Sequence, residues 1–193
     1  MHEDQVCLVA LGGNLPRGDQ SPEVTLRKAI EDLRGFGAQI TAVSRFYRTP
    51  CFPAGAGPDY VNAALVMQGF DDPVTVLKLL HDVEARHDRE RHTRWAGRTL
   101  DLDLIAFGQA VLPDPATQSH WRDLSVSEQM LRAPEQLILP HPRLQDRPFV
   151  LIPLLDVAPD WRHPVLQRSI AEFCADLSAA QCRDIVALPV GAA

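Results

Sequence analysis

The order of hydrophobic patterns along the first 108 residues constrains the fold of this chain more than any other feature. Unbroken apolar runs typical of strands alternate with segments whose apolar residues recur every three or four positions, as on one side of a helix. We predict strands at 6–12, 38–49, 59–69 and 98–108, with one helix after the first strand and another after the third. This order is the split βαβ or ferredoxin-like pattern, which predicts an α+β fold with a mostly antiparallel sheet and helices on one face.

The two helices carry clear terminal signals. Ser21 can cap the first helix, with Pro22 at its first position, and Gly35 can end it. Asp72 and Pro73 are expected to begin the second helix in the same way.

The rest of the chain is less regular. Residues 109–136 contain three prolines and are predicted to be irregular apart from a short helix at 126–133. Beyond them we expect two helices and an edge strand, at 148–159, 166–178 and 184–188. No repeat, low-complexity tract or linker divides the chain, so we expect a single domain spanning 1–193.

Composition narrows the class of protein. Of the 193 residues, 46% are hydrophobic, which indicates a globular chain. The apolar runs are too short to span a bilayer, and the acidic N-terminus is unlike a secretory signal. The four cysteines are scattered, so we expect reduced thiols and a cytoplasmic location rather than a zinc site or a disulfide framework. The net charge of -6 argues against a general nucleic-acid binder.

Two aspartates interrupt the predicted strand at 98–108. Side chains alternate between the faces of a strand, so Asp101 and Asp103 share one face. We expect Ile105 and Phe107 to continue that face and the intervening leucines to point the other way. The carboxylates can converge on one divalent cation or on two, and oxygen ligands without nearby His or Cys suit Mg²⁺. The alternative is a solvated face of an antiparallel sheet.

An arginine-rich segment leads directly into this strand. Five arginines lie within 86–98, on a chain with only two lysines. Arginine forms paired hydrogen bonds with phosphate oxygens, so the segment and the aspartates together would suit a nucleotide with Mg²⁺. The alternative is a solvated helix end in which neighbouring carboxylates neutralise the arginines. No P-loop motif is present, so any phosphate would be bound by arginines.

A third group of residues surrounds the segment 50–58, which is rich in Pro and Gly. The rings of Phe52 and Tyr60 could stack on a heterocycle, and the carboxamide of Asn62 could pair with its amide edge. From the residues alone, a turn with an aromatic lid over the core is the preferred interpretation. In the same way, His141 between two prolines is interpreted as a hydrogen-bonded loop residue rather than a catalytic base.

Four motifs in this order resemble those of the 6-hydroxymethyl-7,8-dihydropterin pyrophosphokinase family of folate biosynthesis. They are ALGGNL, SRFYRTP followed by DYVNAAL, RWAGRTLDLDLIAFG, and LPHPRLQDRPFVLIPLLDVAPDWRHP. The resemblance covers about residues 6–165 and implies a ferredoxin-like αβα sandwich. It also implies transfer of the β,γ-pyrophosphoryl group of ATP to the pterin hydroxymethyl, with release of AMP and with two Mg²⁺ ions.

The resemblance assigns roles to three sets of residues. The expected catalytic set is Asp101 and Asp103, which would hold the metal, with Arg89 and Arg91 on the family's catalytic loop. The residues expected to bind ATP are His81, Glu84, Arg94, Trp95, Arg98, His141 and Arg147. The residues expected to bind the pterin are Tyr60 and Phe149 by stacking, Asn62 by hydrogen bonds, and Thr49, Pro50 and Phe52 through backbone groups. We expect a monomer that acts on small molecules, without nucleic acid or membrane.

The chain departs from the family pattern in several places. Gly13 stands where the family usually has Ser, Cys51 replaces a Pro, and Ile138 replaces a residue that often carries a hydroxyl near ATP. The arginine loop is one residue short, and residues 112–136 are expected to be an insertion. Two competing hypotheses are a binding module of this fold that has lost catalysis and a nucleic-acid-binding member of the same fold class.

Overall fold

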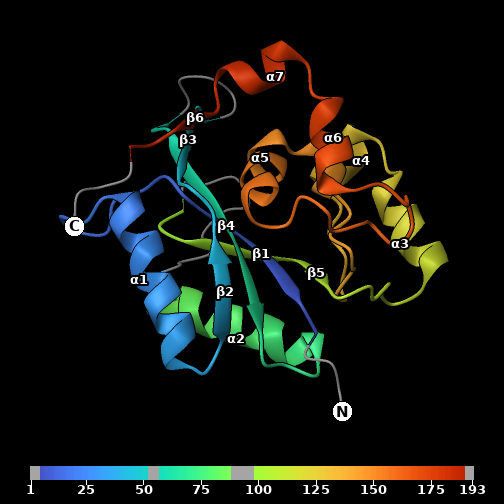
Figure 1. Ribbon diagram of the computed structural model, residues 1–193, viewed down its shortest axis with the longest axis horizontal. Coiled ribbons are helices and arrows are strands. Elements are labelled where there is room, and N and C mark those ends of the chain that lie inside the picture. Colours follow the sequence, from blue (N-terminus) through green and yellow to red (C-terminus); the bar gives the residue numbers. More distant parts are fainter. Residues whose placement is uncertain (1–4, 52–56, 88–97, 190–193) are drawn as a thin grey trace.

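The computed structural model describes residues 5–51, 57–87 and 98–189 and has an α+β fold, with one sheet between two groups of helices (Figure 1). The strands of the described residues are β1 (Cys7–Gly13), β2 (Gln39–Val43), β3 (Tyr47–Thr49), β4 (Tyr60–Gln68), β5 (Asp101–Phe107) and β6 (Val186–Ala187). Each strand pair among them is antiparallel, and the order along the sheet is β5-β1-β4-β3-β6, with β2 also paired to β4. The predicted antiparallel sheet is confirmed.

The prediction of one strand at 38–49 is wrong, because β2 and β3 are separate. Both pair with β4, but the chain between them leaves the ladder. There the hydroxyl of Ser44 accepts a hydrogen bond of 2.8 Å from the backbone N–H of Ala64. This side chain pairs a buried backbone donor of the central strand, so the interruption leaves that donor satisfied.

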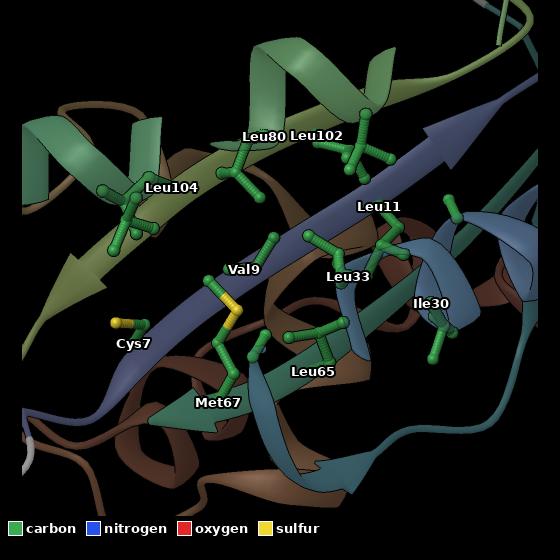
Figure 2. Packing of buried hydrophobic residues seen from close by; sticks show 14 of the residues in the cluster. Cys7, Val9, Leu11, Ile30, Leu33, Leu65, Met67, Leu80, Leu102 and Leu104 are labelled. Atoms are coloured by element: carbon green, nitrogen blue, oxygen red, sulfur yellow. The ribbon is translucent and has the colours of Figure 1, made fainter. Parts of the chain in front are cut away.

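Helices α1 (Pro22–Gly35) and α2 (Pro73–Arg86) cover one face of the sheet. Both begin at the predicted caps, Ser21 and Asp72, whose side chains accept hydrogen bonds from backbone N–H groups of the first turn. Figure 2 shows how apolar side chains of the helices meet those of the sheet, among them Leu33, Leu80, Val9, Leu65 and Leu102.

Helices α5 (Pro148–Val157) and α6 (Ile170–Ala175) cover the opposite face (Figure 1). The expectation of helices on one face, drawn from the order of elements, is therefore wrong, and the αβα sandwich implied by the family resemblance is confirmed. The central strand β4 gives the reason. Its consecutive residues from Ala63 to Met67 are all buried, so it is apolar on both faces instead of alternating.

The end of β5 contains an irregularity that moves Phe107 to the unexpected face. The register between β1 and β5 shifts so that Ile105 has no partner in β1. Ile105 packs with the cluster under α5, as predicted, but Phe107 packs with Leu104 in the cluster under α1 and α2. A bulge adds one residue and reverses the alternation beyond it, so the prediction for Phe107 is wrong.

Residues 112–136 contain two short helices, α3 (Pro115–Arg122) and α4 (Val126–Leu131). The second was predicted, whereas α3 lies in a segment that was expected to be irregular. Its signal is present in the sequence: the side chain of Asp114 accepts a hydrogen bond of 2.9 Å from the N–H of Thr117, and a proline occupies the first turn.

The C-terminal part follows the prediction with shorter elements. A 3₁₀ turn, η1 (Leu144–Asp146), precedes α5, and α6 ends before a further helix, α7 (Ala179–Arg183). The edge strand expected at 184–188 is confirmed as β6, which pairs with β3. No helix in the described ranges is both long enough and apolar enough to cross a membrane.

Candidate active site

Three positions line up across the sheet on the face that α5 covers. Gly12 of β1 pairs with Asp101 of β5 on one side and with Asn62 of β4 on the other. Adjacent strands lie about 4.7–4.9 Å apart, so Asn62 and Asp101 are about 10 Å apart. The sheet thus brings a residue expected to bind the pterin and one expected to bind the metal into a single row.

Two glycines at the end of β1 keep this region open. A Cβ atom at Gly12 would lie 3.0 Å from Oδ1 of Asn62, so a side chain there would fill the space between Asn62 and Asp101. A Cβ atom at Gly13 would lie 2.6 Å from the backbone oxygen of Thr99. The absence of a side chain at Gly13 therefore allows β1 to approach the segment that leads into β5.

The two aspartates each face an arginine. Nη1 of Arg98 donates a hydrogen bond of 2.5 Å to Oδ2 of Asp101, and Nη1 of Arg147 lies 3.4 Å from Oδ2 of Asp103. The aspartate side chains are 21% and 37% exposed. Two like charges on one strand are thus compensated by guanidinium groups from two different segments, and Asp103 is the more accessible of the two because Oδ1 of Asp101 is buried.

Few of the described side chains near Asp101 and Asp103 could act as metal ligands. In the described parts of the chain, no cluster of three or more His, Cys, Asp or Glu side chains could hold a metal by itself. Asp101 and Asp103 offer carboxylate oxygens only. That set fits Mg²⁺, which often takes one or two protein carboxylates and fills its remaining positions with water and substrate phosphates.

Asn14 fixes the segment that carries Arg98. Its Oδ1 accepts a hydrogen bond of 2.8 Å from the N–H of Arg98, and its own N–H donates one of 2.9 Å to the oxygen of Arg98. Its Nδ2 donates to the oxygen of Pro58 at 3.2 Å. This buried residue therefore ties Arg98 to the loop before β4. Asn14 is not among the predicted site residues, although it follows two glycines at the end of a strand, a position typical of functional loops.

Glu84 holds the strand that carries the aspartates. It is buried in α2, and its Oε1 accepts a hydrogen bond of 2.7 Å from the N–H of Leu102, the residue between Asp101 and Asp103. Glu84 was expected beside ATP. In the structure its contact is with the backbone of β5, so it acts on the site through the position of the two carboxylates.

A groove of about 660 Å³ borders this part of β5. Five of the predicted residues line it, namely His81, Arg98, Asp103, His141 and Arg147. Among the described residues, four arginines and two carboxylates line it, whereas the whole chain has a net charge of -6. The groove is therefore a cationic region on an acidic protein, with a volume typical of small-molecule sites.

His141 lines this groove, and both its backbone and its ring form hydrogen bonds. Its backbone N–H donates to the oxygen of Ile105 at 2.8 Å, and its Nδ1 accepts from the N–H of Arg143 at 3.1 Å. Burial lowers the pKa of His141 well below its usual range, and Arg147 and Arg143 lower it further. Because Nδ1 is an acceptor, the neutral ring carries its proton on Nε2.

The residues expected to bind the pterin gather at the other end of the row. Nδ2 of Asn62 donates a hydrogen bond of 2.8 Å to Oγ1 of Thr49, and both side chains are buried. Tyr60 pairs with Thr49 in the ladder between β3 and β4. Burial raises the pKa of Tyr60, with Arg98 opposing and Asp101 adding to the shift, so the two ends of the row interact electrostatically.

Phe149 and Pro50 complete the described part of this set. Phe149 is exposed in the first turn of α5, with the guanidinium carbon of Arg147 5.9 Å from its ring centroid. Pro50 directly follows β3. The other predicted site residues lie outside the described residues: Phe52, Arg89, Arg91, Arg94 and Trp95.

Residues 8–159 match the family described as "7,8-dihydro-6-hydroxymethylpterin-pyrophosphokinase (HPPK)". The chain belongs to the HPPK family. It is 34% identical over 168 residues to the "2-amino-4-hydroxy-6-hydroxymethyldihydropteridine pyrophosphokinase" of Synechocystis sp., covering 86% of this chain and 73% of that protein. A protein of the same name from Pseudomonas aeruginosa is 34% identical over 156 residues, covering 81% of this chain and 82% of the relative. The HPPK membership predicted from the motifs is confirmed.

Solved HPPK structures have the same fold. The wild-type HPPK-DHPS of Plasmodium falciparum matches with a TM-score of 0.64 at 15% identity, over 90% of this chain and 41% of that one. An HPPK-DHPS crystal structure in complex with substrates matches with a TM-score of 0.62 at 12% identity, over 89% of this chain and 43% of that one. The chain thus spans less than half the length of these HPPK-DHPS chains, and the likeness establishes the fold alone.

Proposed function

We propose that this chain transfers pyrophosphate from ATP to the hydroxyl of 6-hydroxymethyl-7,8-dihydropterin, giving AMP and the pterin diphosphate, in folate biosynthesis. Membership of the HPPK family supports this reaction. One structural observation supports its location: the row formed by Asp101, Gly12 and Asn62 sets carboxylates for a metal–nucleotide about 10 Å from a carboxamide for the pterin.

We propose that Asp101 and Asp103 hold Mg²⁺, with two ions as the family resemblance implies. The all-oxygen, two-carboxylate donor set is the supporting observation, because it leaves room for substrate phosphates in the ion's coordination shell. When bound, the ions would neutralise charge on the triphosphate.

The arginines of the site are proposed to bind the phosphates. Arg98 and Arg147 now each contact one carboxylate. Once cations occupy the carboxylates, both guanidinium groups can turn to phosphate oxygens and donate paired hydrogen bonds. His141 would donate from Nε2 without adding charge. Pyrophosphoryl transfer depends on such positioning more than on a strong base. By resemblance alone, Arg89 and Arg91 are proposed as catalytic residues, and Arg94 and Trp95 as residues that line the nucleotide site.

The pterin is proposed to lie above Gly12, stacked between Tyr60 and Phe149, with Asn62 bound to its amide edge. The missing side chain at Gly12 supports this position, since it leaves space toward Asp101 for the hydroxymethyl group. We further propose a monomeric, single-domain enzyme of the cytoplasm that acts on small molecules. Four free cysteines support a reducing compartment.

The nucleotide product tests the reaction. With ATP, Mg²⁺ and the pterin alcohol, we expect AMP and a pterin diphosphate to appear in equal amounts by phosphorus NMR. Formation of ADP would contradict pyrophosphoryl transfer. Calorimetric binding of the substrates by folded protein without any product would favour the alternative of a binding module.

Replacing Asn62 with alanine tests the pterin site. The Asn62→Ala variant is expected to bind the pterin about tenfold or more weakly, because a buried carboxamide that can bond the pterin edge is lost. Its affinity for ATP should stay unchanged, since the groove residues are untouched. Gln68→Ala, at the far end of β4, is the control, and both affinities are measured by calorimetry. An unchanged pterin affinity in Asn62→Ala would exclude this position.

A further inference from the structure

The predicted insertion, residues 112–136, contains α3 and α4, and these helices form part of the wall of the cationic groove. Trp121 of α3, Gln129 of α4 and residues 132–136 line it together with Leu77 of α2 and Ile138. Figure 1 shows α3 and α4 beside each other, on the side of the molecule away from α1. None of these residues belongs to the motifs that carry the family resemblance.

The wall is held firmly against the loop of His141. Gln118 of α3 is fully buried, and its Nε2 donates a hydrogen bond of 3.2 Å to the oxygen of Pro140. Leu112 and Leu139 exchange two backbone hydrogen bonds, of 2.8 and 3.2 Å. The base of α3 is thereby fixed to the same loop that presents His141, and the side chain of Trp121 has a defined place in the groove.

The side chains of this wall differ from those at the other end of the groove, near Asp103, where arginines and a carboxylate lie. Trp121 is the only Trp, Phe or Tyr among the described residues that line the groove, and the guanidinium carbon of Arg132 lies 5.4 Å from its ring centroid. Leu77, Leu137 and Ile138 add apolar surface. The charged oxygens of a triphosphate gain nothing from contact with an indole ring or with leucine side chains. A flat heterocycle suits this wall, because it stacks on aromatic rings and packs on apolar side chains.

Ile138 strengthens this assignment. It is buried and lines the groove. At this position the chain offers the nucleotide only apolar contact. Recognition of the base therefore has to use other groups, and the insertion places an indole and two carboxamides, Gln129 and Gln136, in the same groove.

We propose that the insertion supplies the nucleobase wall of the ATP site, with the indole of Trp121 stacked on the adenine. This inference rests on the proposed function, because it divides the same groove into a phosphate end at Asp103 and a base end at α3. It makes the insertion a determinant of nucleotide affinity rather than a surface loop.

The test compares binding of Mg²⁺–ATP with binding of Mg²⁺–tripolyphosphate, which lacks the base, by calorimetry on the full chain. Trp121→Leu keeps an apolar side chain but removes the ring. We expect it to weaken ATP binding at least about fivefold and to leave tripolyphosphate binding unchanged. Trp121→Phe should restore most of the ATP affinity. Ser119→Ala, on the same helix but outside the groove lining, should bind both ligands as the wild type does.

Two results would overturn the inference: ATP affinity unchanged in Trp121→Leu, or equal losses for ATP and tripolyphosphate. A second measurement does not depend on the folding of that variant. ATP, but not tripolyphosphate, should quench the part of the wild-type fluorescence that is missing in Trp121→Phe, and equal quenching or none would contradict stacking. Because both measurements report binding, an absence of AMP formation would contradict the proposed function while leaving this test intact.

Discussion

Asp101→Asn and Asp103→Asn are each expected to lower the rate of AMP formation by about 10²–10³-fold, the size of loss seen when one group that stabilises transition-state charge is removed. Asparagine has nearly the shape of aspartate and can still accept a hydrogen bond from the facing arginine. It lacks the negative charge that would hold a divalent cation against the triphosphate. The measurement is kcat at saturating ATP, Mg²⁺ and pterin.

Two controls separate loss of the metal site from general damage. Asp82→Asn removes an exposed carboxylate that is also paired with a cation, Lys78 at 2.6 Å, and should keep full activity. In the two site variants, pterin binding should remain near the wild-type value, because Asn62 lies two strands away from Asp101. Full activity in either site variant would remove that carboxylate from the mechanism.

Local chemistry made much of the fold predictable. The helix caps at Ser21 and Asp72, and the alternation that puts Asp101 and Asp103 on one face, depend on a few consecutive residues and were correct. The predicted face of Phe107 was wrong. The bulge at Ile105 depends on pairing with β1 and cannot be recognised from the sequence of β5 alone. The prediction of helices on one face followed the order of elements and did not use the apolar run of β4, whose residues from Ala63 to Met67 are all buried in the structure.

The geometry of the site depends on contacts between distant segments, which patterns in the sequence do not report. Alignment of Asp101, Gly12 and Asn62 needs the register of three strands that are far apart in the chain. The same holds for Asn14, whose side chain reaches both Arg98 and Pro58. The motifs identified which residues matter, but only the sheet gives the spacing between the two substrates.

Glu84 is the clearest case in which the structure adds a role to a predicted residue. In the part of the chain that the structure describes, β5 ends the sheet, so a backbone N–H on its outer side has no strand to pair with. Glu84 provides the acceptor for Leu102, from a helix on the face opposite to the aspartates. The position of both carboxylates therefore depends on one buried side chain of α2.

Glu84→Ala is expected to lower the free energy of unfolding by about 2–4 kcal/mol, from an unsatisfied buried donor at Leu102 and the space left by the side chain. Glu84→Gln keeps an acceptor at the same place and should lose about 1 kcal/mol. Urea unfolding gives both values, with Glu31→Ala, a change at an exposed position of α1, as the control that should stay within about 0.5 kcal/mol. Because Leu102 lies between Asp101 and Asp103, kcat should fall in the same order, with Glu84→Ala below Glu84→Gln. Equal stability and equal kcat in the two variants would mean that the hydrogen bond to Leu102 does not hold the carboxylates in place.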